Sequence, residues 1–133
     1  MVSCIVDTSV WIDFFRGDLR KTLLEFLTEQ IQLRLAVLTD IIRHEILVGA
    51  RSDSHYRELQ RLLGPLECLR ISEDELHHFD SFGWDLRRKG FKGKYTDSSI
   101  AFLSHRHGIP LLTLDRYFYL LARSRVIRLI NLS

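Results

Sequence analysis

A short apolar run at the start of the chain constrains its fold more than any other feature. Val2 to Val6 is rich in β-branched residues and ends abruptly at an acid, Asp7. Such a run, with no alternation of polar residues, is typical of a strand that is buried on both faces of a parallel sheet. Asp7-Thr8-Ser9 then has the composition of a turn and helix cap, and a helix is expected over 10–15. The chain therefore opens with a predicted strand–turn–helix unit.

The alternation of strands and helices continues along the rest of the chain. Apolar runs predict further strands at 35–38, 66–71, 111–114 and 126–132, with helical spacing or cap residues between them. We expect Thr39 to cap one helix, Thr96 to cap another over 97–107, a short helix over 115–123, and a capping box at Ser72–Glu75. This pattern predicts one α/β domain over residues 1–133. Its architecture would be a three-layer α/β/α sandwich with a mainly parallel, roughly five-stranded sheet.

The composition is that of a globular protein, and it excludes several other classes. Of 133 residues, 46% are hydrophobic and 27% are charged, with 2 Pro and 7 Gly, which excludes a linker or a low-complexity chain. The net charge of +2 favours no particular partner. No run approaches the ~20 apolar residues of a membrane span, and no signal peptide is recognisable. We expect a cytoplasmic protein in which Cys4 and Cys68 are reduced core thiols.

Four acids are predicted to lie near the carboxyl ends of the parallel strands, where functional sites usually form. Asp7 and Asp115 directly follow apolar runs, and Asp97 starts a helix that should return antiparallel to the 111–114 strand, close to Asp115. Glu45 lies among apolar residues of a helix. Singly, each acid has a local interpretation as a cap, turn or solvated residue. Together the four carboxylates would repel one another, and a bound divalent cation such as Mg²⁺ would remove that repulsion.

Four short segments around these acids follow one another along essentially the whole chain. They are DTSVWIDFFRG at 7–17, HEILVGA at 44–50, TDSSIA at 96–101 and LTLDRYF at 112–118. In order and spacing they resemble the motifs of the PIN-domain ribonucleases, specifically the VapC-type toxins of prokaryotic toxin–antitoxin pairs. The chain departs from this pattern at one place: Ser98 and Ser99 stand where the family usually has apolar or small residues. This change spares the neighbouring carboxylate.

The resemblance implies an endoribonuclease that hydrolyses RNA phosphodiester bonds with Mg²⁺ or Mn²⁺. The acids that carry over as catalytic residues and metal ligands are Asp7, Glu45, Asp97 and Asp115. Thr113 carries over as a polar supporter of the site, and Thr8 is a weaker candidate of the same kind. Our hypothesis for the reaction is that water attacks phosphorus in line and the 3′ oxygen leaves. The products would then carry 5′-phosphate and 3′-hydroxyl ends.

The resemblance also implies protein partners. It implies a cognate antitoxin that covers the acidic pocket, and a homodimer or a larger toxin–antitoxin assembly. Trp11, Phe14 and Phe15 lie on the helix that follows the first acid, and their spacing favours core packing. A docking surface for the partner is the other interpretation of these three aromatic residues.

A basic segment leads into Asp97. The stretch from Arg87 to Lys94, expected to be a loop, holds five positive charges and no acid; Phe91 lies within it and Tyr95 follows. Basic residues with interleaved aromatics suit single-stranded RNA, although a solvated surface loop explains them equally well. The candidate RNA-binding residues are Arg87, Arg88, Lys89, Lys92, Lys94 and, outside the segment, Arg116.

Two other functional classes are compatible with parts of the sequence. A non-catalytic PIN-fold module that binds RNA or a protein partner would keep the fold without cleaving anything. An aspartyl-phosphate phosphatase or a receiver-like domain would use Asp7 as its nucleophile. The phosphatase usually needs a second Asp where this chain has Ser9, and the receiver needs a Lys where this chain has Arg116.

Overall fold

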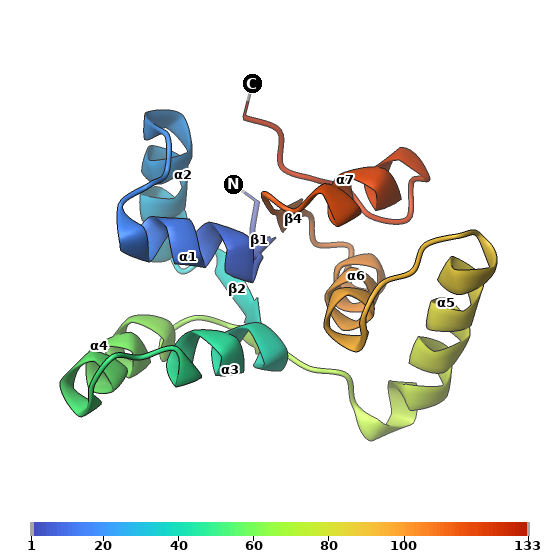
Figure 1. Ribbon diagram of the computed structural model, residues 1–133, viewed down its shortest axis with the longest axis horizontal. Helices are drawn as coiled ribbons and strands as arrows, with labels where there is room; N and C mark the ends of the chain where they lie inside the picture. The colour runs from blue at the N-terminus through green and yellow to red at the C-terminus, as the bar shows by residue number, and fades with distance from the viewer. Residues whose placement is uncertain (1, 133) are drawn as a thin grey trace.

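A parallel sheet runs through the centre of the structure, a computed structural model that describes residues 2–132 (Figure 1). Its strands are β1 (Cys4–Val6), β2 (Ala36–Thr39), β3 (Cys68–Leu69) and β4 (Leu111–Leu112). They lie in the order β3-β2-β1-β4, and every neighbouring pair is parallel. In the central strand, Cys4 pairs with Ala36 and Ile5 pairs with both Val37 and Leu111. This sheet confirms the predicted α/β class.

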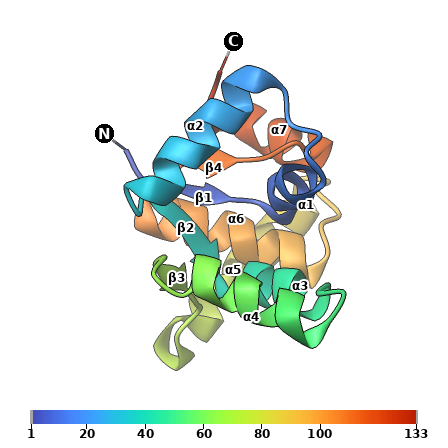
Figure 2. The same ribbon diagram turned by 90° about the vertical axis from the view of Figure 1, so that its left-hand side faces the viewer.

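Helices cover both faces of the sheet. They are α1 (Thr8–Arg16), α2 (Lys21–Gln32), α3 (Asp40–Val48), α4 (Asp53–Leu63), α5 (Leu76–Arg88), α6 (Tyr95–His107) and α7 (Arg116–Arg123), with a 3-10 turn, η1, at Glu73–Glu75. Figure 1 shows α1 to α4 to the left of the sheet and α6 to its right, with α5 outside α6. Figure 2, viewed from the left-hand side, shows α2 and α4 in front of the strands. The arrangement has the three layers that the alternating pattern predicts.

The first strand lies at the centre of the core, as its apolar sequence requires. All three residues of β1 are fully buried. Trp11 of α1 is also fully buried, and its indole N–H donates to the Val6 carbonyl at 3.0 Å. This bond satisfies the polar atom of a large core side chain and holds α1 against the end of β1. The position of Asp7, between these two elements, is therefore fixed by the packing of its neighbours.

The outer strands are shorter than their apolar runs suggest. The run at 66–71 gives the two-residue strand β3, the run at 111–114 gives the two-residue strand β4, and the run at 126–132 gives a single parallel bridge from Leu129 to Leu111. The backbone N–H of Leu111 donates to the Arg128 carbonyl, and that of Ile130 donates to the Leu111 carbonyl. A strand needs a partner along its whole length, and apolar composition alone does not supply one. The predicted fifth strand thus contributes one bridge to the sheet.

Three local expectations are wrong. The helix expected over 97–107 begins at Tyr95, so Thr96 lies inside it and Lys94 takes the cap position. The helix α5 continues to Arg88, so the basic segment is a loop only over 89–94. Cys68 is exposed, because β3 is an edge strand with one neighbour, whereas Cys4 is buried as expected.

Two expected caps are confirmed. The Thr39 hydroxyl accepts from the Ile42 N–H at 3.2 Å, and the box at Ser72–Glu75 forms with Glu75 accepting from the Ser72 N–H at 3.1 Å.

Within residues 2–132, no helix has both the length and the apolar character needed to cross a membrane.

Candidate active site

The carboxylate of Asp7 is buried and held by hydroxyl groups from two parts of the chain. Asp7 is 5% exposed and follows β1 directly. Its Oδ2 accepts from Ser9 Oγ at 2.7 Å and from Thr113 Oγ1 at 2.9 Å. Asp7 stands at the N-cap of α1, but in the described chain its side chain makes no capping bond. A helix cap therefore does not explain this acid, and its carboxylate remains available for a ligand.

Two hydroxyl groups tie the end of β4 to this carboxylate. The Thr113 hydroxyl accepts from the Asp115 N–H at 3.0 Å while it donates to Asp7. The Ser9 hydroxyl accepts from the Leu114 N–H at 3.1 Å while it also donates to Asp7. Each hydroxyl thus uses both its donor and its acceptor capacity. This network fixes the chain after β4 beside the chain after β1, and it places Asp115 near Asp7.

Asp97 lies in the first turn of α6, in the same electrostatic environment. Its carboxylate accepts from the Lys94 N–H at 3.3 Å. Burial raises the pKa of Asp97, and the neighbouring charges of Asp115 and Asp7 raise it further, against the lowering effect of the Lys94 N–H. Asp115 itself caps α7 by accepting from the Tyr117 N–H at 2.9 Å. Asp97 and Asp115 therefore have local structural roles and also share a region of negative potential with Asp7.

Glu45 is exposed on α3, which differs from the apolar surroundings that its sequence neighbours suggest. The apolar side chains Ile42, Ile46 and Leu47 are buried on the inner face of the same helix. The Thr8 hydroxyl donates to Glu45 Oε1 at 3.0 Å. Since Thr8 is the residue after Asp7, this bond brings Glu45 to the margin of the region that holds the three aspartates.

The chemistry of the acids suits a hydrated divalent cation rather than a closed metal cage. Among residues 2–132, no three His, Cys, Asp or Glu side chains are gathered closely enough to hold a metal ion together. Mg²⁺ usually keeps several waters and takes one or two carboxylates from the protein. Asp7, Asp97 and Asp115 offer carboxylate oxygens, and a cation would offset their negative charges. The pKa of Asp97 is raised mainly by burial and further by the charges of Asp115 and Asp7. The donor chemistry therefore fits such an ion.

The candidate RNA-binding residues are spread over three elements. Arg87 and Arg88 end α5, and Arg88 pairs with Asp85. Lys94 borders the acidic region through its bond to Asp97, while the other members lie on the exposed surface. Those others are Lys89 and Lys92 in the loop and Arg116 at the start of α7.

The three aromatic residues of α1 divide between core and surface. Trp11 is core, Phe14 is partly buried, and Phe15 is 39% exposed. Phe15 lines a groove of about 480 Å³ that reaches Thr8 and Glu45. The core interpretation therefore holds for Trp11, and Phe15 contributes to a surface beside the acids.

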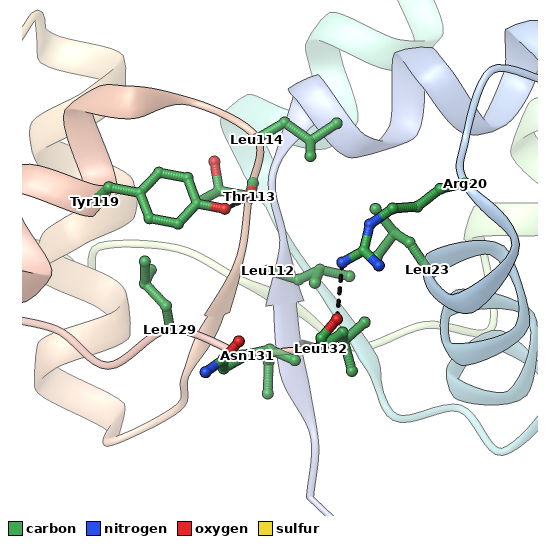
Figure 3. Close-up of a pocket in the computed structure, with 10 residues that line it drawn as sticks. Arg20, Leu23, Leu112, Thr113, Leu114, Tyr119, Leu129, Asn131 and Leu132 are labelled. Carbon is green, nitrogen blue, oxygen red and sulfur yellow. Dashed lines mark hydrogen bonds between the residues drawn. The ribbon is translucent and has the colours of Figure 1, made fainter.

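A second hollow, of about 350 Å³, lies on the β4 side of the molecule (Figure 3). Figure 3 shows the Arg20 guanidinium bound to the Leu132 carbonyl, at 2.9 Å, with Thr113 and Tyr119 on the opposite wall. Its lining is largely apolar and contains no acid, so it is a neighbour of the acidic site and not part of it.

Ser9 and Tyr117 are the site neighbours that sequence reasoning overlooks. The sequence predicts Ser9 to be a turn residue, and its spacing of two residues from Asp7 is the signal for its contact with that carboxylate. Of the two unusual serines after Asp97, Ser99 is buried and donates to the Thr96 carbonyl at 2.8 Å. The helix accommodates this departure without a change at the acid.

The comparisons with known proteins identify the family. The family model for the PIN domain matches residues 4–124. No curated protein sequence matches the chain.

Several solved structures share the fold. A toxin–antitoxin complex from Klebsiella pneumoniae matches with 24% identity and a TM-score of 0.65, covering 85% of this chain and 87% of that one. VapBC2 from Rickettsia felis, bound to a promoter DNA fragment, matches with 16% identity and a TM-score of 0.76, and DNA-bound VapBC from Salmonella typhimurium with 22% and 0.74. Both of these cover 100% of each chain. The resemblance seen in the four motifs is confirmed, and the chain belongs to the PIN domain family.

Proposed function

We propose that this protein is a metal-dependent endoribonuclease, the toxin of a type II toxin–antitoxin pair that acts in the cytoplasm. The observation that carries the proposal is the buried Asp7 carboxylate, held by Ser9 and Thr113 and close enough to Asp97 to raise the pKa of that acid. PIN-domain toxins are generally nucleases, and the solved structures with this fold include toxin–antitoxin complexes. A buried acid with no capping role is typical of a functional site rather than of a stabilising contact.

The acids would hold one or two Mg²⁺ or Mn²⁺ ions. The residues that would bind them are Asp7, Asp97, Asp115 and, from the margin of the site, Glu45. Such an ion supplies charge stabilisation at the phosphate and lowers the pKa of water. Ser9 and Thr113 keep the Asp7 carboxylate in place, so this carboxylate needs little rearrangement when the substrate binds.

The reaction that follows from this arrangement is hydrolysis at phosphorus. A bond forms between the water oxygen and phosphorus, and the bond between phosphorus and the 3′ oxygen breaks. One of the carboxylates takes the proton of the water, and the departing 3′ oxygen is protonated in turn. The products are a 5′-phosphate and a 3′-hydroxyl, and the 2′-hydroxyl takes no part.

The basic residues would direct the RNA to these acids. Lys94 adjoins Asp97, and Lys89 and Lys92 are exposed in the same loop. Phosphate contacts of this kind supply affinity with little sequence preference, and each contact increases the salt dependence of binding. Arg88 is the weakest member of the set, because Asp85 already pairs with it.

An antitoxin would bind across the groove beside the acids. Phe15 and Ile12 expose apolar surface there, and Thr8 and Glu45 connect the groove to Asp7. A partner on this surface would block access of RNA to the carboxylates. A homodimer, or a larger toxin–antitoxin assembly, belongs to the same proposal.

The test is cleavage of single-stranded RNA by the purified protein with Mg²⁺ or Mn²⁺. We expect cleavage that EDTA abolishes, and that Asp7→Asn reduces about 1,000-fold or more, as for a residue in direct contact with the reacting groups. The amide is nearly isosteric, and its oxygen can still accept from Ser9 and Thr113, so the variant should fold. Sequencing of the product ends should find 5′-phosphate.

Three outcomes would contradict the proposal in different ways. Equal cleavage by the wild type and Asp7→Asn would mean a contaminating nuclease or another site. Cyclic-phosphate ends would exclude hydrolysis by water in this form. Binding of RNA without cleavage would favour the non-catalytic module.

A further inference from the structure

The hydroxyl group of Tyr117 is buried without a hydrogen-bond partner. Among the described residues, it is the buried side-chain polar atom that finds no donor or acceptor. Leaving such a group unpaired costs about 1–3 kcal/mol, and native proteins keep few of them. Tyr117 lies in the first turn of α7, directly after the end of the Thr113–Asp115 network. The unpaired hydroxyl therefore lies beside the acidic site.

The surroundings of this hydroxyl combine negative charge with a close backbone contact. A Cβ placed on Gly93 would lie 2.2 Å from Tyr117 Oη and 2.6 Å from Cζ, so the ring lies against a residue that has no side chain. Asp97 and Asp115 are the carboxylates near it. A phenol hydroxyl is a hydrogen-bond donor. Neither of the two carboxylates accepts its proton.

We propose that Tyr117 is a substrate-binding residue whose hydroxyl donates a hydrogen bond to a phosphate oxygen of RNA at the Asp97–Asp115 end of the site. This inference rests on the proposed function and names one contact within it. Asp97 and Asp115 are acceptors, and a phosphate that a cation brings to them also presents acceptors. The ionised carboxylates cannot donate a hydrogen bond to that phosphate, whereas the hydroxyl of Tyr117 can.

The contact with Gly93 links this donor to the basic loop. Gly93 lies between Lys92 and Lys94, so the loop that would bind phosphates also covers the tyrosine hydroxyl. The hydroxyl is buried, so the loop backbone at Gly93 would have to move for it to reach a phosphate, and RNA bound at Lys92 and Lys94 would favour that movement. A residue with a side chain at position 93 would displace the Tyr117 ring. The position of the tyrosine therefore depends on the loop at Gly93.

The experiment uses Tyr117→Phe in the full chain, because this change keeps the ring and its contact with Gly93. Three quantities are measured: the Tm in EDTA, the affinity for a short fluorescently labelled single-stranded RNA in Ca²⁺, and KM and kcat for cleavage of the same RNA with Mn²⁺. We expect the Tm to stay the same or rise, because an unpaired buried group is removed. We expect RNA binding to weaken about 10-fold, with KM rising by a similar factor and kcat changing less.

Tyr119→Phe is the matched control for stability on the same helix. Its hydroxyl donates to the Thr113 carbonyl at 3.2 Å, so its loss should lower the Tm. A lowered Tm for Tyr117→Phe would overturn the inference, because the hydroxyl would then be structural. Unchanged RNA affinity and KM would overturn it as well. If the wild type neither binds nor cleaves the RNA, the proposed function itself fails, and the inference fails with it.

Discussion

Asp7 and Glu45, two acids of the proposed site, differ most in how deeply they are buried. Asp7 is almost wholly buried, and hydroxyl groups from α1 and from the end of β4 fix its carboxylate. Glu45 is exposed on α3, and its carboxylate accepts from the hydroxyl of Thr8. One acid is held by the core of the protein, and the other is held by a surface contact.

The difference shows that the fold fixes the position of one acid and leaves the other free to adjust to a ligand. A carboxylate that is buried between two strand ends cannot move away, so the energy of folding keeps its geometry. A carboxylate on an exposed helix costs the fold little, and it can adjust to a ligand. Substitutions around Asp7 should therefore change stability and activity together, whereas substitutions at Glu45 should separate them.

The largest effect on stability is expected for Thr113→Val. Valine keeps the shape but removes the donor to Asp7 and the acceptor for the Asp115 N–H. We expect the free energy of unfolding, measured by urea titration, to fall by about 2–3 kcal/mol, because two buried polar groups lose a partner. Cleavage should fall more than about 10-fold, since the carboxylate loses one of the two hydroxyl groups that hold it.

Thr39→Val is the matched control at the end of β2. Thr39 is also buried, and its hydroxyl caps α3 through the Ile42 N–H. Loss of this cap should cost about 1 kcal/mol. If Thr113→Val costs no more than this control, the hydroxyl network does not hold Asp7 and the contrast with Glu45 is lost.

Asp97 lies between the two extremes, and its titration gives a second prediction. Its pKa is raised by burial and by the charges of Asp115 and Asp7, so its ionisation opposes folding. The stability that its protonated form provides is present below the unfolded pKa of about 3.9 and is lost as the pH rises through the higher folded value. We therefore expect Asp97→Asn to raise the free energy of unfolding at pH near 7 in EDTA, while cleavage falls about 100-fold or more.

The gain in stability should disappear as the pH is lowered. Below the unfolded pKa, Asp97 is protonated in both states of the wild type, and the two proteins should unfold alike. Asparagine still offers an oxygen to the Lys94 N–H, so the start of α6 is preserved. If Asp97→Asn is less stable than the wild type at neutral pH, this prediction is wrong. The ionised carboxylate of Asp97 would then stabilise the fold, although burial and neighbouring charges disfavour it.

The central part of this site could be predicted because its signals are local. The apolar run before Asp7 determines a buried strand, and the chain topology places Asp97 and Asp115 at the same end of the sheet. Exposure of Cys68 and the short outer strands could not be predicted, because they depend on which strands have neighbours.

The roles of Ser9 and Tyr117 depend on contacts between distant residues. Ser9 binds the N–H of Leu114, and Tyr117 packs on Gly93, and no periodicity in the sequence records either contact. Serine is common at the start of a helix, so the residue type of Ser9 alone favours a role in helix capping over a contact with Asp7.

Glu45→Gln should have the smallest effect on stability and the clearest separation of stability from activity. The amide oxygen can still accept from Thr8, and the side chain is exposed, so the free energy of unfolding should change by less than about 0.5 kcal/mol. Cleavage should fall about 10-fold or more, because one negative charge is lost from the margin of the site. Glu58→Gln on α4 makes the same chemical change at another exposed position and should alter neither quantity. If Glu45→Gln behaves like Glu58→Gln, Glu45 is a surface residue and the acidic site consists of the three aspartates. If it instead destabilises the protein as much as Thr113→Val, the bond from Thr8 is structural, and both acids are held by the core.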